Sequence, residues 1–360
     1  MKFTIDPEHL NIVKSEKIRD VDRYYQSLQC ILGLKFYLEK NKNLKTKFIG
    51  AEVILKRPND EPLNPDMCLQ IDDNNSKILG VPIELKSSLS DENDVFKNLQ
   101  ELERYNDKLS GWNTKSKYVD DEVTVLSPYL EDVGRVLRVL KESIKDKKLN
   151  FTKEILIWQW SLVPSLKNPN QENLLIQQIY GDLTSKNVPV FNKCISDGIK
   201  QDINEMQLII EKERNLFTNQ EPPIEYTMMV MWQNIFGQIL NQKNNLVSVE
   251  EVADIVNDYY TDNLMKNPNN EYKFKKDWAK KALEMLVNIN MAKNKGGRYE
   301  IKLSCQSKNV KSYFCEKVAS YQIKKGLHRD KLNKNKIQSL KDFKHKEKDL
   351  FEDENSQQVM

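Results

Sequence analysis

The stretch Asn64–Ser88, "NPDMCLQIDDNNSKILGVPIELKSS", decides how the first half of this chain is expected to fold. It holds two apolar runs, "DMCLQI" (66–71) and "ILGVPIELKSS" (78–88). The intervening "DDNNSK" is rich in Asp, Asn and Ser, a composition typical of a hairpin turn. The pattern therefore predicts two antiparallel strands joined by a short connection.

Alternation along these strands predicts one apolar and one charged face, because residues two apart share a face of a strand. The apolar face is expected to carry Met67, Leu69, Ile71, Val81, Ile83 and Leu85. The opposite face then carries Asp66, Glu84 and Lys86, with the two carboxylates near each other.

These three charged residues have a chemical interpretation. Two close carboxylates repel each other, and a hard divalent cation with oxygen ligands relieves that repulsion. A lysine two residues further on can hold an attacking water or neutralise charge on a phosphorane-like transition state. The pattern therefore points to a metal site that cleaves phosphodiesters. The other interpretation is a hairpin whose charged face lies in solvent.

The flanking segments alternate between helical and strand patterns. Helices are expected at 14–40, 90–109 and 132–146, and strands at 47–58, 122–128, 154–163 and, more weakly, 173–181. The stretch from Pro189 through "SDGIKQD" is expected to be the loosest, so a boundary is expected between 195 and 205. This order predicts a mixed α/β unit over residues 1–200.

Residues 1–160 resemble the PD-(D/E)xK nuclease superfamily. The resemblance rests on Pro65-Asp66, a gap of 17 residues, and Glu84-Leu85-Lys86, together with the surrounding order of elements. Glu-x-Lys alone is weak, since it recurs at 271–273 and 300–302 without an upstream Pro-Asp hairpin. The resemblance implies a restriction-endonuclease-like mixed β-sheet flanked by helices.

The resemblance also implies roles for the residues of the hairpin. Asp66 and Glu84 would bind Mg²⁺ or Mn²⁺, and the Leu85 carbonyl would complete the inner shell. Lys86 would orient the nucleophilic water.

Two further positions follow from the same family pattern. Members add an acidic residue from the first helix, for which Glu39 is the candidate here. Many also use a polar residue from the helix after the third strand, where Lys97 or Gln100 would serve, Gln100 as a catalytic residue. The Gln-x-x-x-Tyr pattern of the exonuclease branch is not matched, because Gln100 and Tyr105 are five residues apart.

Residues 205–305 show a second pattern: helix, short strand, helix, helix and two β runs joined through Gly296-Gly297. This order resembles a mainly α winged-helix domain, whose third helix enters the major groove and whose wing touches the DNA backbone. The corresponding basic residues are Lys275, Lys276, Lys280, Lys281, Lys293, Lys295 and Arg298, with Lys273 before them. The alternative is a winged helix used for protein contacts.

Charge is unevenly distributed along the 360 residues, of which 39% are apolar and 30% charged. The net charge is +3, but residues 291–348 carry 17 Lys/Arg against 5 Asp/Glu, so the rest is net acidic. A basic C-terminal region favours a polyanionic partner such as nucleic acid, although a solvated lysine-rich surface has the same composition. The tail, 306–360, is expected to be basic and partly helical, with its last ten residues disordered.

Several classes are disfavoured by what the sequence lacks. No run approaches the roughly 18 apolar residues of a membrane helix, and the first residues lack the apolar segment of a signal peptide. Five scattered cysteines favour reduced thiols in the cytoplasm. There is no Walker loop or dinucleotide fingerprint.

The functional hypothesis is a cytoplasmic, Mg²⁺-dependent endonuclease acting on double-stranded DNA in restriction, defence or repair. The other expected partner is a second copy in a homodimer or a larger defence or repair complex. No association with a membrane is expected. The alternative from another class is a non-catalytic DNA-binding or assembly subunit that keeps the nuclease fold. A third possibility is a subunit active only inside a larger complex.

Overall fold

The structure, a computed structural model, describes residues 5–51, 53–73, 75, 77–112, 119–164, 172–202, 217–218, 220–236, 246–260, 274–302 and 309–326. The backbone divides into two compact units, each discontinuous in sequence. The sheet unit comprises Val21–Pro223 with Val249–Ala279. The terminal unit comprises Met1–Asp20, Ile224–Ser248 and Lys280–Met360. The domain limits predicted at 200, 205 and 305 stay predictions.

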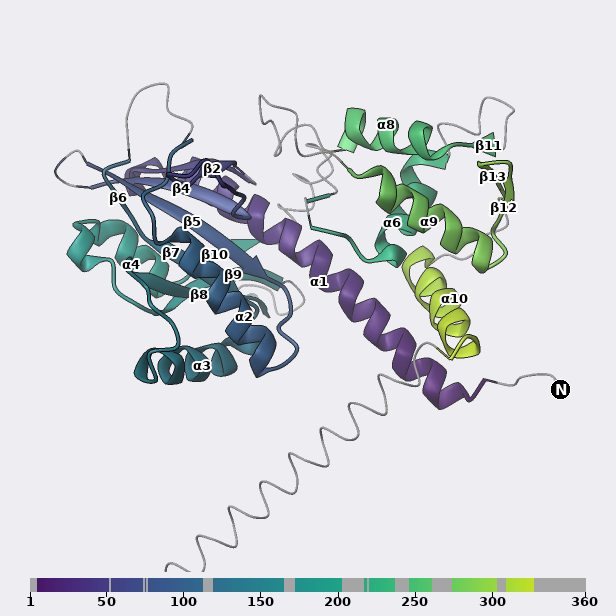
Figure 1. Cartoon of the computed structure of the whole chain (residues 1–360), viewed down its shortest axis with the longest axis horizontal. Helices are drawn as coiled ribbons and strands as arrows, with labels where there is room; N and C mark the ends of the chain where they lie inside the picture. Colours follow the sequence, from purple (N-terminus) through teal and green to yellow (C-terminus); the bar gives the residue numbers. More distant parts are fainter. Residues whose placement is uncertain are drawn as a thin grey trace, which may run out of the picture. The chain divides into compact units, whose positions relative to one another are not determined.

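An eight-stranded mixed sheet organises the sheet unit (Figure 1). Its order is β1-β4-β5-β7-β8-β9-β10, and β6 also pairs with β5. The strands are β1 (Thr46–Ala51), β4 (Met67–Asp72), β5 (Ile78–Lys86), β6 (Asp121–Glu122), β7 (Thr124–Pro128), β8 (Ile155–Pro164), β9 (Glu172–Tyr180) and β10 (Ile199–Asp202). The central β5, β7 and β8 are parallel, and the strands on either side of them are antiparallel.

Helices bury both faces of this sheet. One core combines sheet residues with α1 (Pro7–Lys40) and α4 (Pro189–Asp197), and the other with α2 (Glu92–Leu102) and α3 (Val133–Lys145). Figure 1 shows α2 lying across the sheet. The apolar spacing explains these contacts: Leu28, Ile31 and Leu32 recur one helical turn apart on α1 and are buried. The α/β class expected from the order of elements is confirmed.

Two segments differ from the sequence expectation. The predicted strand 47–58 is interrupted: β1 ends at Ala51, and a separate two-residue strand β2 (Leu55–Lys56) pairs with β3 (Pro62–Leu63). The stretch after Pro189 is not loose, because it forms α4 and then β10, which pairs with β9. Proline is favoured in the first turn of a helix, and Gly198, with φ of 93°, ends α4.

The terminal unit is mainly helical and holds a small sheet. Its elements are α6 (Ile224–Val230), the π-helical turn η5 (Met231–Ile235), β11 (Leu246–Val247), most of α9 (Lys276–Asn288), β12 (Ala292–Lys295), β13 (Arg298–Ile301) and α10 (Val310–Lys324). The expected hairpin is confirmed, since Gly296 and Gly297 have φ of 64° and 90° between β12 and β13. β11 joins the same sheet, in the order β11-β13-β12.

The remaining helix of this region, α8 (Val249–Tyr260), belongs to the sheet unit. α10 confirms the helix expected around 312–323, whereas residues 327–360 of the expected tail lie outside the described residues. None of the helices that the structure describes combines the length and apolar character needed to cross a bilayer.

Candidate active site

The predicted hairpin is present, and its two faces are divided as the alternation requires. β4 and β5 are antiparallel, with Met67 opposite Ile83 and Leu69 opposite Val81. The six apolar residues of the hairpin lie in the core with α1 and α4. Cys68 lies in the opposite core, on the side of α2 and α3. Asp66, one residue before β4, is therefore in register with Glu84 on that second side.

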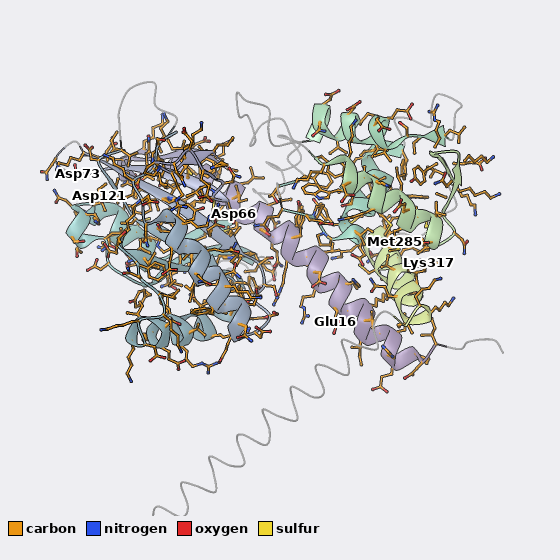
Figure 2. All side chains as sticks on the ribbon, viewed as in Figure 1. Glu16, Asp66, Asp73, Asp121, Met285 and Lys317 are labelled. Carbon is orange, nitrogen blue, oxygen red and sulfur yellow. The ribbon has the colours of Figure 1, made fainter. Side chains whose placement is uncertain are left out.

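Asp66 is held at the point where the β4–β5 ladder ends. Its side chain is buried, with 5% exposed, and its Oδ2 accepts the backbone N–H of Leu85 at 2.7 Å. Its Oδ1 accepts Nε2 of Gln220 at 2.8 Å. The carboxylate thus bonds a strand N–H just beyond the last paired residues, Met67 and Ile83. Figure 2 shows Asp66 at this end of the sheet, and Asp73 beyond the other end of β4.

Glu84 and Lys86 form a pair on the same face of β5. Lys86 Nζ lies 3.2 Å from Glu84 Oε2, and the hydroxyl of Tyr105 donates to Glu84 Oε1 at 2.5 Å. Only 18% of the Glu84 side chain and 20% of the Lys86 side chain are exposed. These charged groups are therefore covered by the protein, which argues against the interpretation of a hairpin face lying in solvent.

Burial and charge repulsion determine the protonation of the site. Burial, followed by the negative charge of Glu84, raises the pKa of Asp66 to about 7, although Lys86 and the two hydrogen bonds act in the opposite direction. Burial by itself would lower the pKa of Lys86, but nearby carboxylates outweigh it and raise that pKa. Those carboxylates belong to Glu84, Asp66 and Glu101. The site thus combines two acidic side chains with one lysine that stays protonated.

Two buried cysteines lie within electrostatic reach of these acids. Burial, and next the charge of Asp66, raises the pKa of the Cys30 thiol on α1. Burial, and next the charge of Glu84, raises the pKa of Cys68. Both thiols therefore stay protonated and inert near neutral pH. The effect of Asp66 on Cys30 places this turn of α1 within electrostatic range of Asp66.

The structure does not bring Glu39 to this site. Glu39 is exposed on α1, nine residues after Cys30. At a rise of about 1.5 Å per residue, this separation is roughly 13 Å along the helix axis. The first helix therefore contributes Cys30, and not the predicted acidic residue, to the surroundings of Asp66.

The helix after β5 contributes different residues from those predicted. Gln100 and Lys97 are exposed on α2, whereas Glu101 acts on Lys86 and Tyr105 bonds Glu84. Tyr105 follows α2 in a short 3-10 turn and is 4% exposed. Its spacing of four from Glu101 matches one helical turn, a signal present in the sequence. No sequence signal indicates Gln220, which is 154 residues from Asp66.

The donors at this site suit a hard divalent cation. Among the described residues no group of three or more His, Cys, Asp or Glu side chains has a metal-binding arrangement. Mg²⁺ commonly uses one or two protein carboxylates and keeps several waters, so Asp66 and Glu84 satisfy its usual protein requirement. A strand residue directs its N–H and C=O to the same edge, so the Leu85 carbonyl faces the Asp66 side as its N–H does.

The predicted nucleic-acid-binding residues are exposed, apart from Lys273, which lies outside the described residues. Four lie at the start of α9 or just before it: Lys275, Lys276, Lys280 and Lys281. Lys275 Nζ is 5.2 Å from the centroid of the Trp278 ring, and Trp278 is buried as expected for a core residue.

The other three basic residues, Lys293, Lys295 and Arg298, lie on the β12–β13 hairpin. Lys295 pairs with Glu300 at 3.2 Å, and Arg298 donates to the Leu246 carbonyl at 3.3 Å. Lys293 lies opposite Glu300 in the ladder, whereas Lys295 and Arg298 face each other beside the turn.

Comparisons with models of known protein families, with curated proteins and with solved structures found no match.

Proposed function

We propose that the sheet unit is a nuclease core of the restriction-endonuclease type that hydrolyses phosphodiester bonds in double-stranded DNA with Mg²⁺ or Mn²⁺. The observation that carries this proposal is the constellation at the end of the β4–β5 hairpin. A buried Asp66 bonded to the Leu85 N–H faces the Glu84–Lys86 pair on one side of the sheet. A mixed sheet with central parallel strands and helices on both faces supports the same proposal.

The residues have distinct roles in this proposal. Asp66, Glu84 and the Leu85 carbonyl would hold the cation, which polarises the phosphoryl oxygen and lowers the pKa of bound water. Lys86, kept protonated by its acidic neighbours, orients the attacking water and neutralises charge that develops on the phosphate. Tyr105 fixes one oxygen of Glu84 by its hydrogen bond and so limits rotation of that carboxylate.

The second part of the proposal is a winged-helix DNA-binding region. The small sheet supports it, because β11 precedes α8 in sequence yet pairs with the second strand of the β12–β13 hairpin. The sequence predicted the short strand and the two-stranded wing, and their pairing is a feature of the structure. The exposed basic residues of α9 and of the hairpin supply phosphate contacts, which position a protein on DNA.

The test is cleavage of duplex DNA by the full chain with Mg²⁺ or Mn²⁺. We expect Asp66→Ala and Lys86→Ala to abolish cleavage while leaving duplex binding in Ca²⁺ unchanged. Lys302→Ala is a matched control, because it removes the lysine of another Glu-x-Lys sequence, Glu300-Ile301-Lys302. Lys302 is the first residue after β13. Cleavage at wild-type rates in both site variants would overturn the site assignment.

The same experiment separates the alternative function. If the wild-type chain binds duplex DNA but does not cut it in the presence of any divalent metal tested, the non-catalytic DNA-binding or assembly subunit is favoured. Reconstitution with co-purified partners then distinguishes that subunit from one active only in a larger complex. A restriction, defence or repair role, and a homodimer, stay proposals.

A further inference from the structure

Gln220 contacts the site from a segment that is remote in sequence. Its Nε2 donates to Asp66 Oδ1 at 2.8 Å, although Asp66, Glu84 and Lys86 all belong to the Asn64–Ser88 stretch. Gln220 follows the last strand of the sheet and lies four residues before α6 begins. The hairpin pattern that defines the other residues of the site therefore does not include it.

Buried neighbours anchor the segment that carries Gln220. Phe217 is 1% exposed and stacks on Phe274 with ring centroids 4.7 Å apart. The backbone N–H of Thr218 donates to the hydroxyl of Tyr24 on α1 at 3.0 Å. Because Thr218 is itself buried, the chain two residues before Gln220 is fixed to α1. Folding therefore fixes the backbone close to Gln220, whose own side chain is exposed at its bond to Asp66.

The two hydrogen bonds of Asp66 together restrict its carboxylate. The Leu85 N–H on Oδ2 leaves the carboxylate free to rotate about that contact, whereas the second donor on Oδ1 removes this freedom. An amide donor also compensates the buried charge without neutralising it, unlike a lysine in the same position. The two bonds thus hold the Asp66 carboxylate in a fixed orientation for a cation.

We propose that Gln220 is a positioning residue of the metal site, whose amide holds the Asp66 carboxylate in the orientation that accepts the divalent cation. This inference rests on the proposed function, since it assigns a further residue to the same site. Outer-shell partners of ligating carboxylates typically contribute about 10–100-fold in metal affinity. Gln220 therefore acts mainly on the binding of the cation and less on the chemical step.

The test compares Gln220→Met, which keeps the length of the side chain without its donor, and Gln220→Ala, which removes the side chain. We expect the Mg²⁺ concentration for half-maximal cleavage to rise about 10-fold or more in both variants. At saturating Mg²⁺, kcat should stay within about threefold of wild type. Binding of Mn²⁺ without DNA, measured by calorimetry, should weaken by the same factors.

The control is Gln177→Met, which removes an amide that donates to the Ser196 carbonyl at 3.0 Å in the same unit. It should leave Mg²⁺ dependence and Mn²⁺ affinity unchanged. Circular dichroism in EDTA confirms that each variant is folded, and a misfolded Gln220→Met leaves Gln220→Ala to decide.

The outcomes distinguish this inference from the proposed function. Unchanged Mg²⁺ dependence in folded Gln220 variants would overturn the positioning role, while loss of cleavage in Asp66→Ala would keep the nuclease assignment. An equal loss of kcat at saturating Mg²⁺ with unchanged Mn²⁺ affinity would likewise overturn it. If wild type neither binds Mn²⁺ nor cleaves DNA, the proposed function fails, and the inference with it.

Discussion

At the scale of single residues, Asp66 lies in surroundings that oppose its own ionisation. It is buried beside a second carboxylate, and its pKa is raised to about 7. In the unfolded chain the same carboxyl has an ordinary pKa of about 4. The folded state therefore binds this proton more tightly than the unfolded state. That difference makes the free energy of unfolding depend on pH.

We predict that Asp66→Asn stabilises the metal-free fold at pH 8. A group with a raised folded-state pKa contributes stability that is fully present below its unfolded pKa and lost as pH rises through its folded pKa. For Asp66 this stability is lost between about pH 4 and pH 7. A pKa shift of this size corresponds to on the order of 2–4 kcal/mol in the free energy of unfolding. Asparagine carries no charge and avoids the loss.

Urea unfolding in EDTA at pH 8 and pH 4 measures this effect. The gain should appear at pH 8 and vanish at pH 4. Asp72→Asn, at the exposed opposite end of β4, should show no such difference. Equal stability of Asp66→Asn and wild type at both pH values would contradict the proposed surroundings of Asp66.

Tyr105 provides a second prediction at the residue scale. Burial, and next the charge of Glu84, raises its pKa well above the ordinary value, so its hydroxyl remains a donor to Glu84. Tyr105→Phe should lower cleavage about tenfold and cost roughly 1–2 kcal/mol, as expected for a lost hydrogen bond to a charged group. Cleavage kinetics and urea unfolding measure both effects. Tyr180→Phe, which changes another partly buried tyrosine beside the same core, should leave cleavage at the wild-type rate.

At the scale of elements, a buried polar cluster joins β6 to the turn after α2. Glu122 is 4% exposed and accepts the Trp112 Nε1–H at 2.9 Å and the Leu109 N–H at 3.1 Å. Lys153 forms an ion pair with the same carboxylate and also donates to the Asp107 carbonyl. This cluster fixes the segment that follows Tyr105, close to the site.

We predict that Glu122→Ala destabilises the fold by about 3–5 kcal/mol, because it leaves two buried donors unpaired and removes the carboxylate partner of the mostly covered Lys153 ammonium. The reduced midpoint of urea unfolding measures this cost. Glu61→Ala is the control, since Glu61 makes exposed ion pairs with Arg57 and Arg104 and its loss should barely move the midpoint. Similar midpoints for the two variants would contradict a structural role for the cluster.

At the scale of the whole molecule, the β12–β13 hairpin is basic, whereas the β4–β5 hairpin carries the acidic residues. This difference agrees with a proposed DNA contact at the first hairpin and a proposed cation site at the second. Phosphate contacts release counterions, so each contributes about 0.9 to the slope of log affinity against log salt. Changing Lys293, Lys295 and Arg298 to Gln should therefore weaken duplex binding and lower that slope by up to about 3.

Binding titrations at several salt concentrations measure this slope. The matched control replaces three exposed lysines of α3 and its following turn, Lys141, Lys145 and Lys147, with Gln. These changes remove the same charge from the sheet unit and should leave the slope nearly unchanged. Equal slopes for both triple variants would argue against the hairpin as a DNA contact.

The sequence by itself determined the hairpin and the assignment of its faces. Strand periodicity is local, so alternation alone separated Asp66, Glu84 and Lys86 from the apolar residues that pack against α1 and α4. The succession of helical and strand patterns likewise determined the α/β class. Local patterns also located the β12–β13 hairpin, because a Gly-Gly turn needs no distant partner.

The surroundings of those three residues, by contrast, follow from the tertiary structure. The burial of Asp66, the bond from Tyr105 to Glu84 and the amide of Gln220 depend on packing between segments far apart in the chain. The predicted Glu39 failed to reach the site for the same reason, since helix periodicity does not reveal which turn of α1 passes Asp66. The number of residues between two positions does not reveal whether they are in contact in the fold. The alternation of side chains along a strand, in contrast, can be read from the sequence of that strand alone.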